Sequence, residues 1–262
     1  MINVQMIVAD DELMLGLQKL MWSAGDAIME VYHSKDFDVQ TKSDDSPVTK
    51  ADLAAHFILT AQLAELTPSI PIVSEEDSAS LDVPKSHSLY WLIDPLDGTK
   101  EFLKRNDEFT CNLALIENNI PVLGFVGVPA QNELYFGGFS LPATRQFRNR
   151  EPELIRHSPS SNGTTRVVAS KSHLNTETQA FIDSIQGEVE LVQAGSSLKF
   201  LKIATGEADI YPRLAPTCEW DTAAAQAVLE GAGGQVTQAS GDKMRYGKEA
   251  FLNQYFIARA LS

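Results

Sequence analysis

The sequence has few cysteines and no long apolar run, and each shortage narrows the class of protein. Its two cysteines, Cys111 and Cys218, lie in apolar segments without CxxC spacing. This favours packing residues in a reducing cytoplasm over a disulfide framework. No run approaches the roughly 20 apolar residues of a membrane span, and residues 1–12 do not have the pattern of a signal peptide. We therefore expect a cytoplasmic protein, and leave open peripheral association with the cytoplasmic face of the inner membrane.

Positive charge is also scarce. Lys and Arg total 21 against 35 Asp and Glu, and the formal net charge is −14. This balance argues against non-specific binding to nucleic acid, because nucleic acid is itself a polyanion. A phosphorylated small-molecule substrate would have to meet bound cations or a local basic pocket. The sequence leaves open whether the protein is a monomer or a homodimer.

The length and apolar content predict one domain, 1–262, made of two packed halves. The chain is 44% hydrophobic and can bury a large core. Residues 140–163 are rich in Pro, Ser, Arg and Asn, so we expect an exposed connection there between halves at about 1–145 and 146–262. The sequence pattern predicts helices at 13–32, 53–66, 100–104, 175–184, 198–205 and 221–230, and strands at 70–73, 89–93, 110–116, 122–128, 133–136, 166–169, 189–192 and 209–211.

The most informative stretch is Asp94-Pro95-Leu96-Asp97-Gly98-Thr99, which follows the apolar residues 89–93. A strand that ends in two carboxylates, a glycine and a hydroxyl supplies hard oxygen ligands beside backbone N–H groups that can face a phosphate. Pro95 stiffens the turn, and Gly98 permits a ligand to approach the backbone closely. The junction predicts magnesium-dependent phosphate chemistry.

Five carboxylates lie at the ends of predicted elements: Asp52, Glu75, Asp94, Asp97 and Asp221. Taken singly, Asp52 or Asp221 is typical of a helix cap, and Glu75 is typical of an exposed acidic turn. Brought together, the five would repel one another unless cations neutralised them, so a shared site implies a metal. Oxygen ligands without a His or Cys partner favour Mg²⁺ or Mn²⁺ over zinc.

Other catalytic motifs are absent from the sequence. The five histidines show no HExxH spacing, and the chain contains neither a GxSxG elbow nor a GxxxxGK[ST] loop. Zinc hydrolases, serine hydrolases and P-loop nucleotidases are therefore disfavoured.

Four segments, in this order, resemble the inositol monophosphatase superfamily of lithium-sensitive, magnesium-dependent phosphatases. The segments are PVTKAD at 47–52, SEE at 74–76, WLIDPLDGT at 91–99 and EWDTAAA at 219–225. Within that superfamily, the segments at 99–102, 169–173, 195–200 and 208–217 are most similar to 3'(2'),5'-bisphosphate nucleotidases of the CysQ type. The resemblance covers nearly the whole chain and implies an α/β (α+β) fold, a layered αβαβα sandwich.

The resemblance implies hydrolysis of the 3'-phosphate of adenosine 3',5'-bisphosphate, giving AMP and phosphate. The sulfated analogue 3'-phosphoadenylyl sulfate is a second implied substrate, giving adenylyl sulfate, and both belong to sulfate assimilation. Inhibition by lithium is implied as well. Two alternatives stay open: an inositol monophosphatase or sugar phosphatase with the same metal centre, and a catalytically silent nucleotide-binding protein on this scaffold.

The resemblance also implies roles for single residues. The metal ligands would be Glu75, Asp94 and the Leu96 main-chain carbonyl for one Mg²⁺, and Asp94, Asp97 and Asp221 for a second. Two or three ions would bind in each site. Thr99 and Asp52, with Glu75, would deprotonate and orient the attacking water.

Nucleotide specificity is expected to come from the second half. We predict that Lys199 and Arg213 meet the 5'-phosphate, because Lys offers a point charge and Arg a planar fork. The alternatives are a solvated helix position for Lys199 and a structural ion pair for Arg213. The other residues predicted to contact the substrate are Glu75, Leu96, Asp97, Gly98, Thr99, Ser170, His173, Ser196, Glu219 and Asp221.

Overall fold

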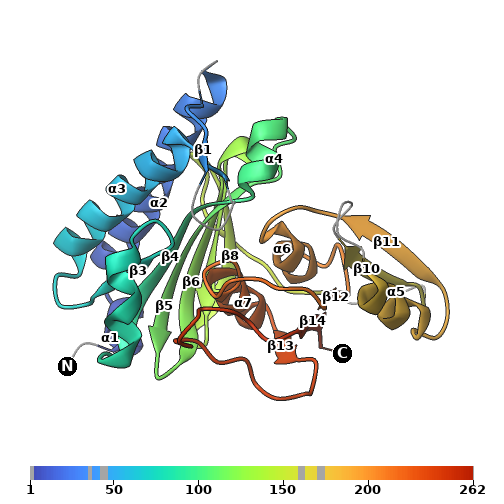
Figure 1. The fold of residues 1–262 in the computed structure, drawn as a ribbon. Helices are drawn as coiled ribbons and strands as arrows, with labels where there is room; N and C mark the ends of the chain where they lie inside the picture. The colour runs from blue at the N-terminus through green and yellow to red at the C-terminus, as the bar shows by residue number, and fades with distance from the viewer. Residues whose placement is uncertain (1–2, 35–36, 42–46, 159–162, 170–174, 262) are drawn as a thin grey trace.

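Two large β-sheets and the helices that pack on them form alternating layers (Figure 1). The structure, a computed structural model, describes residues 3–34, 37–41, 47–158, 163–169 and 175–261. Helices α2 (Asp11–His33) and α3 (Lys50–Leu66) pack together on one face of the first sheet, and α7 (Ala223–Gly231) packs on its other face. Helix α6 (Leu198–Ala204) lies beside α7, between the two sheets. This arrangement confirms the layered α/β fold that the sequence predicts.

The first sheet has seven strands in the order β3-β4-β5-β6-β7-β8-β9. Only the β3–β4 pair is parallel, and the other neighbours are antiparallel. The strands are β3 (Ile72–Ser74), β4 (Leu89–Asp97), β5 (Thr110–Glu117), β6 (Ile120–Val128), β7 (Glu133–Gly138), β8 (Leu141–Phe147) and β9 (Glu153–Leu154). Short connections join β5 to β6 and β6 to β7, which explains their antiparallel pairing.

Both faces of this sheet are buried, so apolar side chains lie on both faces of its central strands. In β4, Trp91 and Ile93 pack in the core beneath α2 and α3, whereas Tyr90 and Leu92 pack in the core that contains α6 and α7. Helix α7 approaches the sheet very closely: a Cβ atom built on Gly124 of β6 would lie 2.1 Å from the main-chain oxygen of Ala224. The small residues at this contact hold the start of α7, and the loop before it, against the sheet.

The second sheet has five strands in the order β11-β10-β12-β14-β13. Strand β10 pairs in parallel with β11 and β12, and β14 pairs antiparallel with β12 and β13. The strands are β10 (Thr165–Ala169), β11 (Val189–Gln193), β12 (Ile210–Arg213), β13 (Gly234–Gln238) and β14 (Phe256–Ala260). Helix α5 (Thr176–Asp183) packs against β12.

Short elements complete the described chain. They are α1 (Val4–Val8), β1 (Gln40–Thr41), β2 (Pro47–Val48), the 3₁₀ helices η1 (Ser78–Lys85) and η2 (Pro129–Gln131), and α4 (Thr99–Lys104). Among the described residues, no helix combines the length and apolar character that crossing a bilayer requires.

Several boundaries differ from the sequence prediction. Residues 140–163 are not simply an exposed connection, because β8 and β9 lie there and Ala143 is fully buried. The polar residues of β8 do not show the pattern of a strand in the sequence. Its position in the sheet is determined by its hairpin with β7. Helix α7 begins at Ala223 rather than Asp221, and β4 continues to Asp97 rather than ending at residue 93. The division into halves at about 1–145 and 146–262 stays a prediction.

Candidate active site

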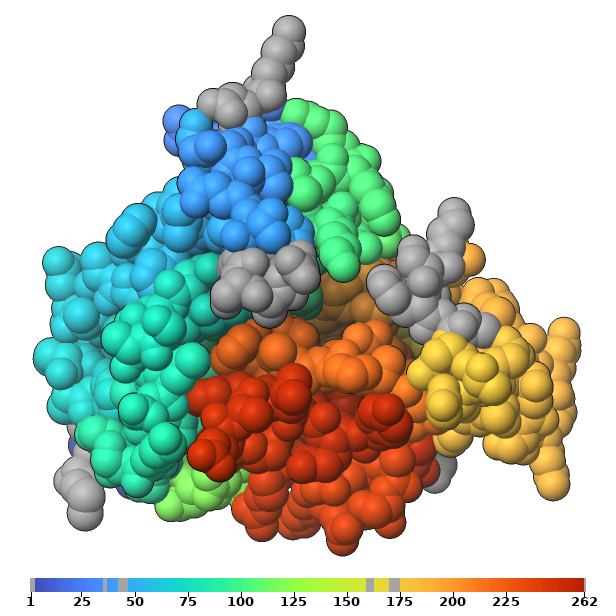
Figure 2. All heavy atoms as spheres, viewed as in Figure 1, coloured from blue at the N-terminus to red at the C-terminus, as the bar shows by residue number. Residues whose placement is uncertain are grey.

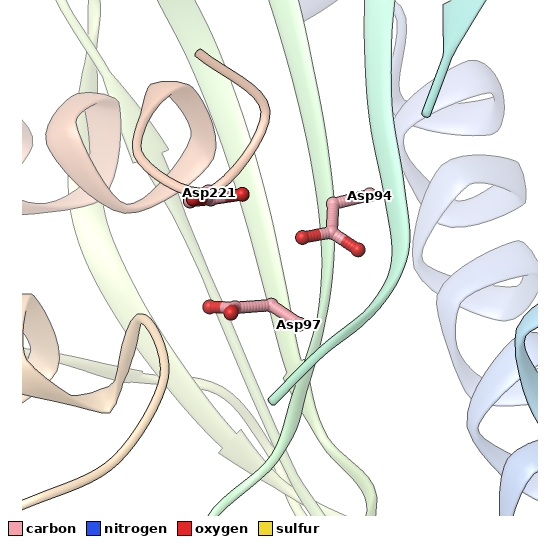
Figure 3. Close-up of side chains that lie close together, drawn as sticks. All are labelled: Asp94, Asp97 and Asp221. Atoms are coloured by element: carbon pink, nitrogen blue, oxygen red, sulfur yellow. The ribbon is translucent and has the colours of Figure 1, made fainter. Parts of the chain in front are cut away.

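The two acidic residues of the opening motif lie on either side of an irregularity in β4. Asp94 pairs with Asn112 of β5 and Asp97 pairs with Thr110, so two residues of β4 face a single intervening residue of β5. Such a bulge bends the strand and redirects its side chains. Asp94 is almost fully buried, and its Oδ1 accepts a hydrogen bond of 3.1 Å from the Leu96 N–H. The bulge allows both carboxylates to face the same space (Figure 3).

The third carboxylate comes from a distant part of the chain. Asp221 lies in the loop before α7, where its Oδ2 accepts a 2.9 Å hydrogen bond from the Cys218 N–H. Asp94, Asp97 and Asp221 each place one carboxylate oxygen within 4.8 Å of the others (Figure 3). Oxygen atoms at this separation suit shared coordination of a hard cation.

This acidic cluster is electrostatically unfavourable by itself. Burial raises the pKa of Asp94 and of Asp221 well above the ordinary value, and the neighbouring carboxylates raise both further. Burial also raises the pKa of Asp97, although hydrogen bonds from Ser196 and Ser197 and the positive charge of Lys199 oppose this. A bound cation would remove the repulsion.

Glu75 lies at the edge of the cluster rather than within it. Its N–H donates to the Ile93 main-chain oxygen at 3.1 Å, which places Glu75 beside β4 just before Asp94. Its negative charge raises the pKa of both Asp94 and Asp221. Its half-buried side chain is nevertheless outside the group whose oxygens lie within 4.8 Å of one another.

Asp52 and Thr99 meet on the side of the site that α3 lines. The Thr99 hydroxyl donates to Asp52 Oδ1 at 3.3 Å and to the Leu96 main-chain oxygen at 3.4 Å. The other oxygen of Asp52 accepts from the hydroxyl and N–H of Thr49 at 2.6 and 2.8 Å, which forms a capping box at the start of α3. Burial raises the pKa of Asp52, so its carboxylate is a better proton acceptor than an exposed one.

A serine loop holds Asp97 from the opposite side. The Ser196 hydroxyl and the Ser197 N–H donate to Asp97 Oδ2 at 2.6 and 2.7 Å. Both serine hydroxyls hydrogen bond to Thr110 of β5. Lys199, buried on α6, donates to the Ser196 main-chain oxygen at 2.7 Å. Sequence reasoning missed Thr110, whose only signal is its polar side chain at the start of a largely apolar strand.

A pocket of about 130 Å³ opens beside the acidic cluster. Burial lowers the pKa of Lys199, in its wall, to about 8, although the negative charge of Asp97 opposes the shift. Arg213 donates through Nη2 to the Pro216 main-chain oxygen at 2.8 Å, and its buried Nε has no hydrogen-bond partner among the described residues. The pocket is lined by Asp97, Gly98, Glu101, Gly195, Ser196, Lys199, Phe200, Tyr211, Arg213, Thr217, Asp221 and Thr222.

Glu75, Leu96, Thr99 and Glu219, all predicted to contact the substrate, are not among the residues that line this pocket. Ser170 and His173 lie outside the described residues. Glu219 is fully buried, and its carboxylate accepts from the N–H groups of Gly247 and Lys248, contrary to the expectation from sequence. Its position next to Trp220-Asp221 in the sequence could not reveal that it points away from the site.

Comparison with known proteins relates this geometry to a family. The model of the inositol monophosphatase family matches residues 10–260. The chain belongs to this family. It is 43% identical over 236 residues to the 3'(2'),5'-bisphosphate nucleotidase CysQ of Escherichia coli strain K12, covering 89% of this chain and 94% of that protein. It is 40% identical over 243 residues to the protein of the same name from Buchnera aphidicola, covering 91% of this chain and 90% of that protein.

The fold of this inositol monophosphatase family member is also similar to solved structures. The crystal structure of CysQ from Bacteroides thetaiotaomicron matches with a TM-score of 0.85 and 38% sequence identity, covering 97% of this chain and 98% of that one. A structure of the extragenic suppressor protein SuhB from Bartonella henselae matches with a TM-score of 0.77 at 22% identity, which supports the fold alone.

We expect a divalent cation to stabilise the cation-free family member against heat, because it would relieve the repulsion among the three aspartates. At about 100 times its dissociation constant, such an ion adds about 2.7 kcal/mol. For a chain of this size that corresponds to a rise in Tm of roughly 5–10 °C. Thermal unfolding of chelator-treated protein, with and without Mg²⁺ or Mn²⁺, measures the shift. An equal shift with KCl at matched ionic strength would attribute it to screening instead.

Proposed function

We propose that this protein is a 3'(2'),5'-bisphosphate nucleotidase that releases the 3'-phosphate of adenosine 3',5'-bisphosphate as inorganic phosphate, leaving AMP. The 40–43% identity to bacterial proteins named CysQ over most of the chain supports this activity. The observation that carries the proposal is the acidic cluster beside a pocket with two cationic side chains, Lys199 and Arg213. The sulfated analogue 3'-phosphoadenylyl sulfate is proposed as a second substrate.

The donor set fits Mg²⁺, with Mn²⁺ as a substitute. All candidate donors are oxygens, and the three aspartates would be destabilised without a cation. We propose that Asp94, Asp97 and Asp221 hold one ion, and that Glu75, Asp94 and the Leu96 carbonyl hold another, with two or three ions in each site. A bound ion would neutralise phosphate oxygens and lower the pKa of a coordinated water.

The chain itself supplies a proton acceptor and a phosphate cradle. We propose that the Thr99 oxygen takes a proton from the attacking water while its own hydroxyl proton passes to Asp52, to which it already donates. Glu75 would orient the same water from the opposite side. Gly98 precedes α4 with a φ of +91° and no side-chain cap, which leaves the first N–H groups of the turn to face the transferred phosphate.

The second phosphate of the substrate distinguishes this proposal from its main alternative. Lys199 and Arg213 line the pocket next to Asp97 and Asp221, so a substrate phosphate held at the cluster would leave a second one within their reach. A monophosphate substrate, such as an inositol or sugar monophosphate, has no second phosphate for these cations to bind. A substrate panel of adenosine bisphosphate, 3'-AMP, inositol phosphate and sugar phosphates tests the choice.

Lys199→Met is expected to lower kcat/KM for adenosine 3',5'-bisphosphate by about 10–100-fold, because a hydrogen bond to a charged group contributes about 1.5–3 kcal/mol. The loss for 3'-AMP, which lacks the 5'-phosphate, should be much smaller. Steady-state kinetics on both substrates at saturating Mg²⁺ measures the difference. Lys202→Met is the matched control, because Lys202 lies on the same helix but pairs with Glu207.

Equal losses on the two substrates would remove Lys199 from the 5'-phosphate site. Equal wild-type kcat/KM on 3'-AMP and the bisphosphate would count against the pocket as a whole.

We also propose that the reaction takes place in the cytoplasm, in keeping with two free cysteines.

A further inference from the structure

The loop that carries Asp221 is held from behind by the C-terminal segment 247–253. Glu219 has no exposed surface, although a carboxylate is costly to bury. Its Oε2 accepts from the Gly247 N–H at 2.6 Å, and its Oε1 accepts from the Lys248 N–H at 3.0 Å. The Lys248 ammonium lies 2.5 Å from Oε1. The carboxylate is thus fully satisfied, and it ties two distant parts of the chain together.

The main-chain N–H and C=O groups of Glu219 also form hydrogen bonds. Its N–H donates to the Phe251 main-chain oxygen at 2.7 Å, and its own oxygen accepts from the N–H groups of Thr222 and Ala223 at 3.2 and 3.0 Å. The ring of Phe251 packs on Trp220, with centroids 5.4 Å apart. Glu219 therefore hydrogen bonds directly to segment 247–253 and to the start of α7.

Asn253 holds the other end of the same loop. Its side-chain amide donates to the Cys218 main-chain oxygen at 2.7 Å and to the Thr222 hydroxyl at 2.9 Å. Cys218 in turn donates its N–H to Asp221 Oδ2. The segment 247–253 thus fixes the residues that orient the Asp221 carboxylate. Figure 2 shows this C-terminal region, in red, packed beside the teal region that includes η1, where Pro84 lies close to Gly247.

We propose that Glu219 is a positioning residue, which with Lys248 and segment 247–253 holds Asp221 against the repulsion of Asp94 and Asp97 so that the cation site exists before a cation binds. The inference rests on the proposed function and assigns Glu219 a role different from substrate contact. Without this tie, the Asp221 loop can relieve the repulsion by moving outward. Binding a cation would then have to restore its position at a cost in affinity.

Glu219→Gln tests the proposal directly. The amide keeps the shape of the side chain but removes the charge and leaves one donor of segment 247–253 without an acceptor. Loss of a residue that orients a metal ligand typically costs about 10–100-fold in metal affinity, and we expect a loss in that range for Mn²⁺ measured by electron paramagnetic resonance without nucleotide. Amide hydrogen exchange in residues 217–223 should be faster in the cation-free variant.

Glu133→Gln is the matched control. Glu133 is also a buried carboxylate, and it accepts from the Tyr135 hydroxyl and the Arg145 guanidinium on β7 and β8, outside the pocket of the acidic cluster. We expect the Glu133→Gln substitution to lower the Tm without weakening Mn²⁺ binding. Wild-type Mn²⁺ affinity in Glu219→Gln, or an equal loss in Glu133→Gln, would overturn the proposal.

Two further variants keep the test decisive if Glu219→Gln does not fold. Gly247→Ala should displace the donors without removing a carboxylate, because Gly247 has a φ of +80° and an added Cβ would lie 3.0 Å from Asn119 Nδ2 and 3.1 Å from Tyr90 Oη. It should weaken Mn²⁺ binding as Glu219→Gln does. Glu219→Gln leaves the Lys248 ammonium without its carboxylate partner. Adding Lys248→Met removes that ammonium and should recover part of the lost Mn²⁺ affinity.

The measurements separate this inference from the proposed activity. Mn²⁺ affinity and hydrogen exchange do not depend on which phosphate ester is hydrolysed, so they test the positioning role even if the bisphosphate is not turned over. In the activity assay, Glu219→Gln should raise the Mg²⁺ concentration for half-maximal rate by about the same factor as its loss of Mn²⁺ affinity. It should retain most of kcat at saturating Mg²⁺. A lowered kcat with unchanged Mg²⁺ dependence would contradict the proposal.

Discussion

Asp94→Asn is expected to lower the metal-dependent release of phosphate from adenosine 3',5'-bisphosphate by about 10³-fold or more, because metal assistance contributes several kcal/mol. Asp94 is the residue shared by both proposed ion positions, and it is almost fully buried between the other carboxylates. A neutral amide cannot replace its charge at either position. Phosphate release at increasing Mg²⁺ measures the loss, and excess Mg²⁺ should not restore the rate.

The same substitution should not destabilise the cation-free protein. Burial and four neighbouring carboxylates, Glu75, Asp97, Asp221 and Asp52, raise the pKa of Asp94, so its ionised form opposes folding at neutral pH. We expect the cation-free Asp94→Asn variant to unfold at the wild-type Tm or above, and to gain far less Tm from Mg²⁺. Asp82→Asn, which removes an exposed carboxylate paired with Lys85, is the control. An active Asp94→Asn variant would disprove the metal centre.

Asp52→Asn is expected to reduce kcat by about 10²–10⁴-fold, the usual contribution of a positioned proton acceptor. The Mg²⁺ concentration for half-maximal rate should change little, because Asp52 is not among the three clustered carboxylates. The amide oxygen can still accept from the Thr49 N–H, so the capping box at the start of α3 is largely kept. Steady-state kinetics over a Mg²⁺ series separates the two quantities.

A double-mutant cycle identifies the partner of Asp52. Thr99→Val removes the hydroxyl that donates to Asp52, and if the two act as one unit, the double variant should lose little more than Asp52→Asn alone. Thr49→Ala is the structural control, since it removes the cap hydroxyl and costs about 1 kcal/mol of stability with a much smaller loss of kcat. Additive losses for Asp52→Asn and Thr99→Val would argue against a shared proton path.

The residues of the site could be predicted largely from the sequence, because each lies at a position where an element begins or ends. Asp52 follows Thr49 at the start of α3, and Asp94 and Asp97 follow an apolar run. These positions combine a carboxylate with a turn residue or a cap, a local pattern that needs no tertiary contact to recognise. The ordered set of such segments then indicated the family.

Contacts between distant elements could not be predicted in the same way. Ser196 is predicted to meet the substrate and lies in the pocket wall, but the sequence does not reveal that its hydroxyl donates to Asp97. Glu219 is also predicted to contact the substrate, and instead it faces Gly247 and Lys248 behind the site. Glu75 lies outside the tight group of aspartates. Sequence spacing does not determine which side of a loop a carboxylate faces, because that depends on the surface against which the loop packs.

The amino-acid sequence by itself determined the fold class, the family and the identity of the acidic residues, since these follow from local apolar patterning and from short motifs in a definite order. The tertiary structure alone decided that Asp94, Asp97 and Asp221 form a tight group without Glu75, and that Glu219 pairs with Lys248 behind the site. The physical reason is that burial and charge separation depend on the packing of elements far apart in the chain. Asp94 and Asp221 are separated by 127 positions, yet their oxygens lie within 4.8 Å because α7 packs tightly against the sheet that carries β4.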